Sequence, residues 1–206
     1  DRTLRAEIAK KAIPVLEAKE KFSCPELTYA TDRPGGNFKA RIKFNYLKKY
    51  RYLRRVLREK VGAINHRFTL SSPYILNNRR TRKLMKTLMD KKVDVTIYTN
   101  SLASTDAIYV AAHLYNSVFK WGKMGMKSYV HSGKYSEVGP IVNPKVKDAK
   151  WGTHSKTHIY ENINENGKIE SEVMIGTYNI DNRSNFYNNE MALFCKGNPD
   201  FTESMR

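Results

Sequence analysis

The fold is decided by residues 67–99, which read RFTLSSPYILNNRRTRKLMKTLMDKKVDVTIYT. Two runs in this stretch, 67–72 and 93–99, are rich in β-branched and aromatic residues and are typical of strands. Between them, apolar residues recur at helical spacing over 79–91. The inward positions of this helix are Leu84, Met85 and Leu88. A strand, a helix and a second strand in this order predict a βαβ unit.

The alternation of helices and strands continues after this unit. The further predicted elements are a helix over 105–121 and strands over 126–131, 153–162, 168–176 and 190–195. Ser104 or Thr105 is the expected N-cap of the helix. Asn166-Gly167 is a strong hairpin signal, so the strands around it cannot be parallel neighbours. We therefore predict an α/β fold in which a mixed β-sheet is flanked by helices.

The part of the chain before this unit has a different character. A helix is predicted over 1–20, and a connector over 23–40, which carries Pro, Gly and Asp. Over 46–61, apolar residues recur at helical spacing while lysine and arginine fill the remaining positions. This basic amphipathic helix either faces phosphate groups or an anionic leaflet, or it presents a solvated outer face. We divide the chain into a helix and connector, 1–45, and a main domain, 46–206.

The composition indicates a folded and strongly basic protein. Lysine and arginine total 37 against 20 acidic residues, which gives a formal net charge of +17. A surface of this charge attracts polyanions, so nucleic acid and an anionic membrane surface are both candidate partners. No apolar run is long enough to cross a bilayer, and the first residues lack the apolar stretch of a signal peptide. Because position 1 is not Met, we expect the chain to be processed, excised or otherwise part of something longer.

Cysteine and metal chemistry are not prominent in this sequence. Cys24 and Cys195 are too few for a disulfide scaffold and lack the paired spacing of a zinc site, so both are expected to be free thiols. No His, Asp and Glu cluster has convincing ligand spacing, and we expect no metal and no cofactor.

Among the five histidines, His154 differs because Lys156 follows it two positions later on a predicted strand. Residues i and i+2 of a strand project to the same face, so imidazole and ammonium share a side. The neighbouring strand ends in Gly176-Thr177-Tyr178-Asn179, with a hydroxyl and a carboxamide again two apart. Such groups suit phosphodiester cleavage, because they supply a nucleophile and neutralise phosphate charge. The alternative is that His154 and Lys156 only decorate an exposed strand.

A longer pattern surrounds these residues. His154-x-Lys156 is followed by Glu161, then by Gly176-Thr-Tyr-Asn-Ile-Asp-Asn-Arg-Ser184 and Asn189-Glu190. The pattern resembles the His-x-Lys signature of the phospholipase D superfamily and is similar to its bacterial cardiolipin synthase-like branch. Ser72-Pro73-Tyr74 and residues 99–106 also resemble that branch. The resemblance covers residues 60–196 and implies a phospholipase D-like half.

The resemblance also implies a role for each residue of the pattern. His154 would be the nucleophile or the acid and base, while Lys156 and Asn179 would hold the phosphate. Thr177 would place a hydroxyl near that phosphate. Glu190 would orient a histidine and stabilise the imidazolium that forms.

Two positions depart from the family pattern. Glu161 stands where Asp is usual and, like Gly176, is expected to contribute to structure rather than to chemistry. Thr177 replaces the commoner Ser but keeps the hydroxyl. The stretch between Glu161 and Gly176 is longer than usual, which an extended hairpin accommodates at little cost.

Only one His-x-Lys motif is present, since none of the other four histidines is followed two residues later by Lys. In the family mechanism one imidazole attacks phosphorus and another protonates the leaving group, so this chain would encode half a site. The second half is expected either from an upstream domain of a longer protein or from a homodimer. We favour the upstream domain, because residues 1–45 look like the passage between two halves.

Three functions are compatible with these residues. The first is phosphodiester hydrolysis or phosphatidyl transfer through a phosphohistidine, with a phospholipid as substrate, as in cardiolipin synthesis. The second is a nuclease of the same superfamily, because phosphate neutralisation drives nucleic-acid binding. The third is a catalytically silent anion-binding module. For the first, the expected location is cytoplasmic or peripheral at the cytoplasmic membrane.

Overall fold

The structure is a computed structural model that describes residues 21–33, 51–134 and 148–206. Its strands are β1 (Glu26–Thr31), β2 (Arg67–Ser71), β3 (Asp94–Asn100), β4 (Lys127–His131), β5 (Thr157–Ile163), β6 (Ile169–Gly176) and β7 (Met191–Lys196). Its helices are α4 (Tyr52–Ala63), α5 (Arg79–Asp90), α6 (Ile108–Gly122), α7 (Asn182–Phe186) and α8 (Pro199–Ser204). The predicted helix over 1–20 and the division at residue 45 lie outside the described residues.

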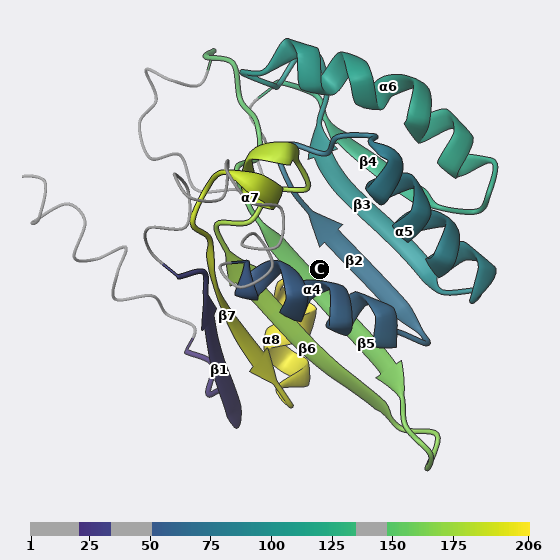
Figure 1. Cartoon of the computed structure of the whole chain (residues 1–206), viewed down its shortest axis with the longest axis vertical. Coiled ribbons are helices and arrows are strands. Elements are labelled where there is room, and N and C mark those ends of the chain that lie inside the picture. Colours follow the sequence, from purple (N-terminus) through teal and green to yellow (C-terminus); the bar gives the residue numbers. More distant parts are fainter. Residues whose placement is uncertain (1–20, 34–50, 135–147) are drawn as a thin grey trace, which may run out of the picture.

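The strands form one mixed sheet in the order β1-β7-β6-β5-β2-β3-β4 (Figure 1). The strands β2, β3 and β4 are parallel, as the βαβ unit predicts. All other neighbours are antiparallel, including the β5–β6 hairpin, whose turn contains Gly167 at a φ of 75°. The predicted α/β class with a mixed sheet is confirmed. This topology brings the ends of β1, β2, β3 and β6 to the same edge as the beginnings of β5 and β7.

The first face of the sheet carries the hydrophobic core. Directly opposed residues of neighbouring strands share a face, so the register assigns each side chain to one of the two sides. On the first face, apolar residues of the strands pack against α4, α5 and α6. Its fully or almost fully buried members include Phe68, Leu70, Val95, Ile97, Met174 and Phe194 of the strands and Leu53, Leu57, Met85, Leu88, Leu114 and Trp121 of the helices. Met85 and Leu88 thus point inward as predicted, and Leu84 packs against the core while half-buried.

The second face of the sheet is less covered. Of the described helices, α8 packs on this side, where Ser171 of β6 hydrogen-bonds Thr202, and it lies behind the sheet in Figure 1. Large apolar side chains on the same face remain exposed, namely Leu27, Tyr29, Tyr129, Ile175, Met191 and Leu193. Among the described residues no helix is long and apolar enough to cross a membrane.

The N-terminal segment departs from the prediction of a connector. Residues 26–31 form β1, an edge strand paired with β7, although five of its six residues are exposed and its large apolar residues, Leu27 and Tyr29, face away from the core. The expected free thiols are also wrong: Cys24 and Cys195 form a disulfide across a sequence separation of 171. The pairing of Leu27 with Cys195 brings Cys24 beside β7, and the two Cα atoms lie 5.5 Å apart, an ordinary distance for a disulfide.

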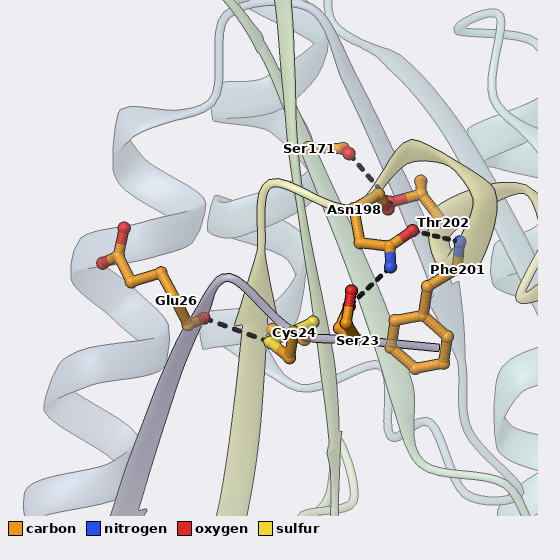
Figure 2. The surroundings of a disulfide bond; sticks show 8 residues. Ser23, Cys24, Glu26, Ser171, Asn198, Phe201 and Thr202 are labelled. Atoms are coloured by element: carbon orange, nitrogen blue, oxygen red, sulfur yellow. Dashed lines mark hydrogen bonds between the residues drawn. A yellow bond between two sulfur atoms is a disulfide. The ribbon is translucent and has the colours of Figure 1, made fainter. Parts of the chain in front are cut away.

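Figure 2 shows the surroundings of this disulfide. The Asn198 side chain accepts a hydrogen bond from the backbone N–H of Phe201, which caps α8, and donates one to the carbonyl of Ser23. Phe22 packs against Phe201 with ring centroids 5.5 Å apart. The segment before β1 is therefore attached to α8 as well as to β7.

Two element starts differ from the prediction. The strand expected from residue 153 begins at Thr157, so His154 and Lys156 precede β5. Helix α6 begins at Ile108 rather than at residue 105, and its N-cap is Ala107. The predicted cap residues are engaged elsewhere: the Ser104 hydroxyl bonds Asn100, and the Thr105 hydroxyl accepts from the N–H of Ala107.

Candidate active site

All predicted site residues except Glu161 lie at the edge of the sheet where these strand ends meet. His154 and Lys156 precede β5, Gly176 ends β6, Thr177 and Asn179 follow it, and Glu190 precedes β7. The segments 72–74 and 101–106, which follow β2 and β3, reach the same edge (Figure 1). The candidate active site is built on these loops.

The loop that carries His154 is held by Asn100. The Asn100 amide donates to the carbonyl of Thr153 and accepts from its N–H, both at 2.9 Å. At Gly152 a Cβ atom would lie 2.5 Å from the carbonyl oxygen of Ser104, so this close approach requires glycine. The His154 side chain itself is exposed, and its ring lies edge-on to that of Tyr74 with centroids 6.0 Å apart.

Lys156 lies half-buried among carboxylates. Its Nζ donates to the carbonyl of His154 at 2.9 Å. Burial lowers the pKa of its ammonium, whereas the nearby carboxylates of Glu190, Asp181 and Asp106 act in the opposite direction. The Lys156 ammonium is thus held beside the buried carboxylate of Glu190.

Buried Glu190 is hydrogen-bonded to exposed Thr177. The Thr177 hydroxyl donates to Oε2 of Glu190 and accepts from the N–H of Met191 at 3.1 Å. Glu190 is only 3% exposed, and its Oε1 has no hydrogen-bond partner among the described residues. At Gly176 a Cβ would lie 2.4 Å from the carbonyl oxygen of Met191, which explains why glycine precedes Thr177. One carboxylate oxygen is therefore available to a further donor.

Asn179 is buried in the turn that leads into α7. Its N–H donates to the Ser184 hydroxyl at 3.0 Å, and the N–H of Ser184 donates to the Asp181 carboxylate at 2.8 Å. The Oδ1 atom of Asn179 has no hydrogen-bond partner among the described residues. The backbone of this turn is fixed by local bonds while the carboxamide oxygen is left unbonded.

Tyr74 and Asp106 form a second polar pair beside His154. The phenol donates to the carboxylate at 2.6 Å. Burial, followed by this hydrogen bond, raises the pKa of Tyr74 to about 12. The same bond lowers the pKa of Asp106, and the nearby charge of His154 contributes in the same direction. Sequence reasoning gave neither residue a role, although both lie in segments that follow parallel strands, which meet at one edge of a sheet.

Asp32 anchors the site from β1. Its carboxylate is 2% exposed, accepts from the N–H groups of Leu53 and Glu190, and lies 3.5 Å from Arg51. Its own N–H donates to the carbonyl of Glu190 at 2.8 Å. Burial raises the pKa of Asp32 despite these donors. No sequence signal marks Asp32, because it follows a strand that the sequence pattern does not reveal.

Glu161 lies away from these residues, on the second face of the sheet. It is 1% exposed and pairs with Arg206 at 2.6 Å and with Arg67 at 3.6 Å. Its contacts join β5 to β2 and to the chain that follows α8.

The structure thus brings some of the predicted residues together and leaves others without direct contact. Thr177 bonds Glu190, and Lys156 lies near the carboxylates of Glu190 and Asp106. Among the described residues no hydrogen bond joins the side chains of His154, Lys156 and Asn179. Nor does any group of three or more His, Cys, Asp or Glu side chains within the described ranges suit a metal ion.

Comparison with known proteins identifies the family. Residues 57–206 match the family described as cardiolipin synthase, phospholipase D-like domain. The chain belongs to this family. The structure of NucT from Helicobacter pylori has a TM-score of 0.52 at 12% identity, covering 87% of this chain and 92% of that chain. Phosphatidylserine synthase from Haemophilus influenzae has a TM-score of 0.51 at 12% identity, covering 82% of this chain and 33% of that one. Both show the shared fold.

A relative in sequence is considerably longer than this chain. An uncharacterised protein of Helicobacter pylori is 28% identical over 140 residues, which are 66% of this chain and 25% of that protein. The chain therefore spans about a quarter of the length of the curated relatives that it matches.

Proposed function

We propose that this chain supplies one half of a phosphodiesterase or phosphatidyltransferase site that works through a phosphohistidine. The observation that carries the proposal is the edge of the sheet at which His154 and Lys156 lie with the Thr177–Glu190 pair, in a chain that belongs to a phospholipase D-like family. Hydrolysis and transfer differ only in whether water or an alcohol accepts the phosphoryl group.

The proposed first step forms a bond between a ring nitrogen of His154 and phosphorus and breaks the bond to the leaving oxygen. The leaving alkoxide takes a proton from a second imidazole, supplied by the other half. In the second step water or an alcohol gives its proton to that imidazole and attacks phosphorus, which releases His154. Charge and protons balance over the two steps.

The other residues would stabilise charge during these steps. The Lys156 ammonium would bind a phosphate oxygen as a strong point charge, and the Asn179 amide would donate to another. The Thr177 hydroxyl, already placed by Glu190, would lie beside the same phosphate. In the assembled site, the unbonded Oε1 of Glu190 would accept from an imidazole N–H and hold its tautomer.

A second His-x-Lys half would complete the site, and we propose that it comes from another part of a longer protein. The single motif in 206 residues and the greater length of the curated relatives support this arrangement. The second face of the sheet offers a surface for this second half, because exposed apolar side chains, among them Leu27 and Tyr129, lie on that face. Patches of this kind mark interaction sites. In a homodimer, by contrast, two copies of this chain would supply both His-x-Lys motifs.

Phospholipid is the preferred substrate, and nucleic acid is the alternative. The family description names cardiolipin synthase, which favours phosphatidyl transfer at an anionic membrane surface. The net charge of +17 favours either class of substrate. The Cys24–Cys195 disulfide favours an oxidising compartment over the cytoplasm as the location.

The test compares His154→Ala with wild type in the full-length protein. Phospholipid vesicles with a labelled headgroup and labelled single-stranded and duplex DNA are offered separately, and His113→Ala, a change at an exposed histidine of α6, is the control. We expect release or exchange of the headgroup in wild type and control, and a phosphohistidine after rapid quenching. Cleavage of DNA alone would select the nuclease. If the protein binds phosphate but neither wild type nor any variant reacts with lipid or DNA, the chain is a catalytically silent anion-binding module.

A further inference from the structure

A cavity lies between α4 and α5, on the face of the sheet that carries the hydrophobic core. Its volume is about 500 Å³, within the range of ligand pockets, roughly 300–1,000 Å³. Its floor is apolar and is formed by Leu57, Val61, Phe68, Leu70, Leu84 and Met85. None of the proposed site residues lines it. In Figure 1 the two helices lie side by side over the first face of the sheet.

Cations surround this apolar floor. Arg54 and Arg58 of α4 and Arg80 and Lys83 of α5 line the cavity. Within the described parts of the chain, none of the four forms an ion pair with an acidic side chain. Burial lowers the pKa of Arg54, and the charges of Arg80 and Arg58 lower it further. An anion bound among these groups would relieve their mutual repulsion.

Phe186 orders two of these cations. The guanidinium groups of Arg54 and Arg80 lie over its ring, 5.5 and 4.5 Å from the centroid. Arg54 also donates to the carbonyl of Asn185 at 3.1 Å. Phe186 of α7 therefore holds Arg54 of α4 near Arg80 of α5.

The cavity also contains one unused polar group. His158 lines it and is 1% exposed. Its Nδ1 lies 2.8 Å from the hydroxyl of Tyr160, and its Nε2 has no hydrogen-bond partner among the described residues. Because burial raises the pKa of Tyr160, the phenol stays protonated and can donate to Nδ1, which leaves Nε2 as an N–H donor.

We propose that this cavity binds an amphiphilic anion with one hydrocarbon chain. The chain lies on the apolar floor, and its carboxylate or phosphate is bound by Arg54, Arg58 and Arg80. A nucleic-acid strand would use the cations but not the apolar volume, so the combination favours a lipid. Binding here does not depend on the reaction at His154.

Direct titration of the full-length protein tests the proposal, with dodecanoate and dodecyl phosphate below their micelle concentrations. We expect saturable binding of at least one probe, and Arg54→Gln and Arg80→Gln should each weaken it about tenfold or more. The matched controls, Arg55→Gln and Lys86→Gln, change exposed cations on the same helices that already pair with acidic residues. These two control variants should bind each probe with an affinity within about twofold of that of wild type. The relative affinity of the two probes identifies the headgroup.

Further arms separate this site from a merely basic surface. Leu84→Trp should fill the apolar floor and weaken the binding of dodecanoate and dodecyl phosphate. The binding of inorganic phosphate should be unchanged. His154→Ala should bind the probes as wild type does, whatever its catalytic activity. The proposal is overturned if no probe binds saturably, or if Arg80→Gln behaves like Lys86→Gln in a protein with an unchanged melting temperature. It is also overturned if inorganic phosphate or an oligonucleotide binds as tightly as the probes and is weakened equally by Arg54→Gln and Arg80→Gln.

Discussion

Asn100 controls where His154 lies, because it bonds both backbone groups of Thr153. Asn100→Ala removes these two bonds, each worth about 0.5–1.5 kcal/mol. We expect a loss of about 1–3 kcal/mol in the free energy of unfolding and, if the proposed function holds, at least a tenfold loss in kcat. Urea denaturation and the headgroup assay measure the two effects.

Asn65 provides a matched control for this prediction. It makes the same two bonds with the backbone of Ile163, at the other end of β5 and away from the site. Asn65→Ala should lower stability while leaving kcat unchanged. Equal losses of kcat in both variants would show that Asn100 acts on stability alone.

The burial of His158 makes the stability of the protein depend on pH. Burial lowers the pKa of its imidazole from 6.5 to about 3, so the folded state disfavours protonation. Below pH 6.5 the unfolded chain binds a proton that the folded chain does not. His158 should therefore reduce stability as pH falls from 6.5 toward 3, by at most about 1.4 kcal/mol per pH unit.

Urea denaturation at several pH values checks this dependence. His158→Asn, which keeps a polar group near the position of Nδ1, should have a shallower fall in stability over this range than wild type. His113→Asn, at an exposed histidine of α6, should follow wild type. Parallel curves for all three proteins would contradict the assignment of the acid sensitivity to His158.

Gly176, the last residue of β6, packs against β7 without room for a side chain. A Cβ there would lie 2.4 Å from the Met191 carbonyl oxygen and 2.9 Å from the Ala192 Cβ. Gly176→Ala should destabilise the protein by about 1–3 kcal/mol, as overpacking does. At Gly122 of α6 no such atom lies within 4 Å, so Gly122→Ala should leave stability unchanged or raise it by up to about 1 kcal/mol. Thermal and urea denaturation would measure the stability of both variants. Equal changes in stability for Gly176→Ala and Gly122→Ala would refute the close approach at Gly176.

The predictable elements are those with a one-sided apolar pattern. The helix predicted over 79–91 is observed over Arg79–Asp90, and its N-cap, Asn78, accepts from the N–H groups of Arg80 and Thr81. The strand β1 could not be predicted in this way. Only Ala30 of its residues is buried, and its place depends on pairing with β7 far along the chain.

The same distinction applies to the candidate site. Local spacing singles out the pairs two residues apart, His154 with Lys156 and Thr177 with Asn179, whereas Glu190 is singled out by the resemblance of the longer pattern. Asp32, Tyr74 and Asp106 reach the site through the order of the strands, which local spacing does not contain. The ion pair of Glu161 with Arg206 joins residues far apart in the sequence and could not be predicted from local spacing either.

The Cys24–Cys195 bond joins the two ends of the described chain and should stabilise the fold. Cross-links of this kind contribute about 2–4 kcal/mol, mainly by restricting the unfolded chain. Cys195→Ser and Cys24→Ser should each lower the free energy of unfolding by a similar amount, and the double variant by no more than either. A reductant should destabilise wild type but not the variants. Free thiols in the oxidised wild type, measured with a thiol reagent under denaturing conditions, would contradict the bond.

This bond also encloses most of the polypeptide in a covalent ring, since 171 positions separate its two cysteines. A protease that cuts once within the ring would open a loop without releasing a fragment. On a denaturing gel the nicked protein would migrate as one band until a reductant separated it into two pieces. Limited digestion can thus map accessible loops while both halves of the sheet remain joined.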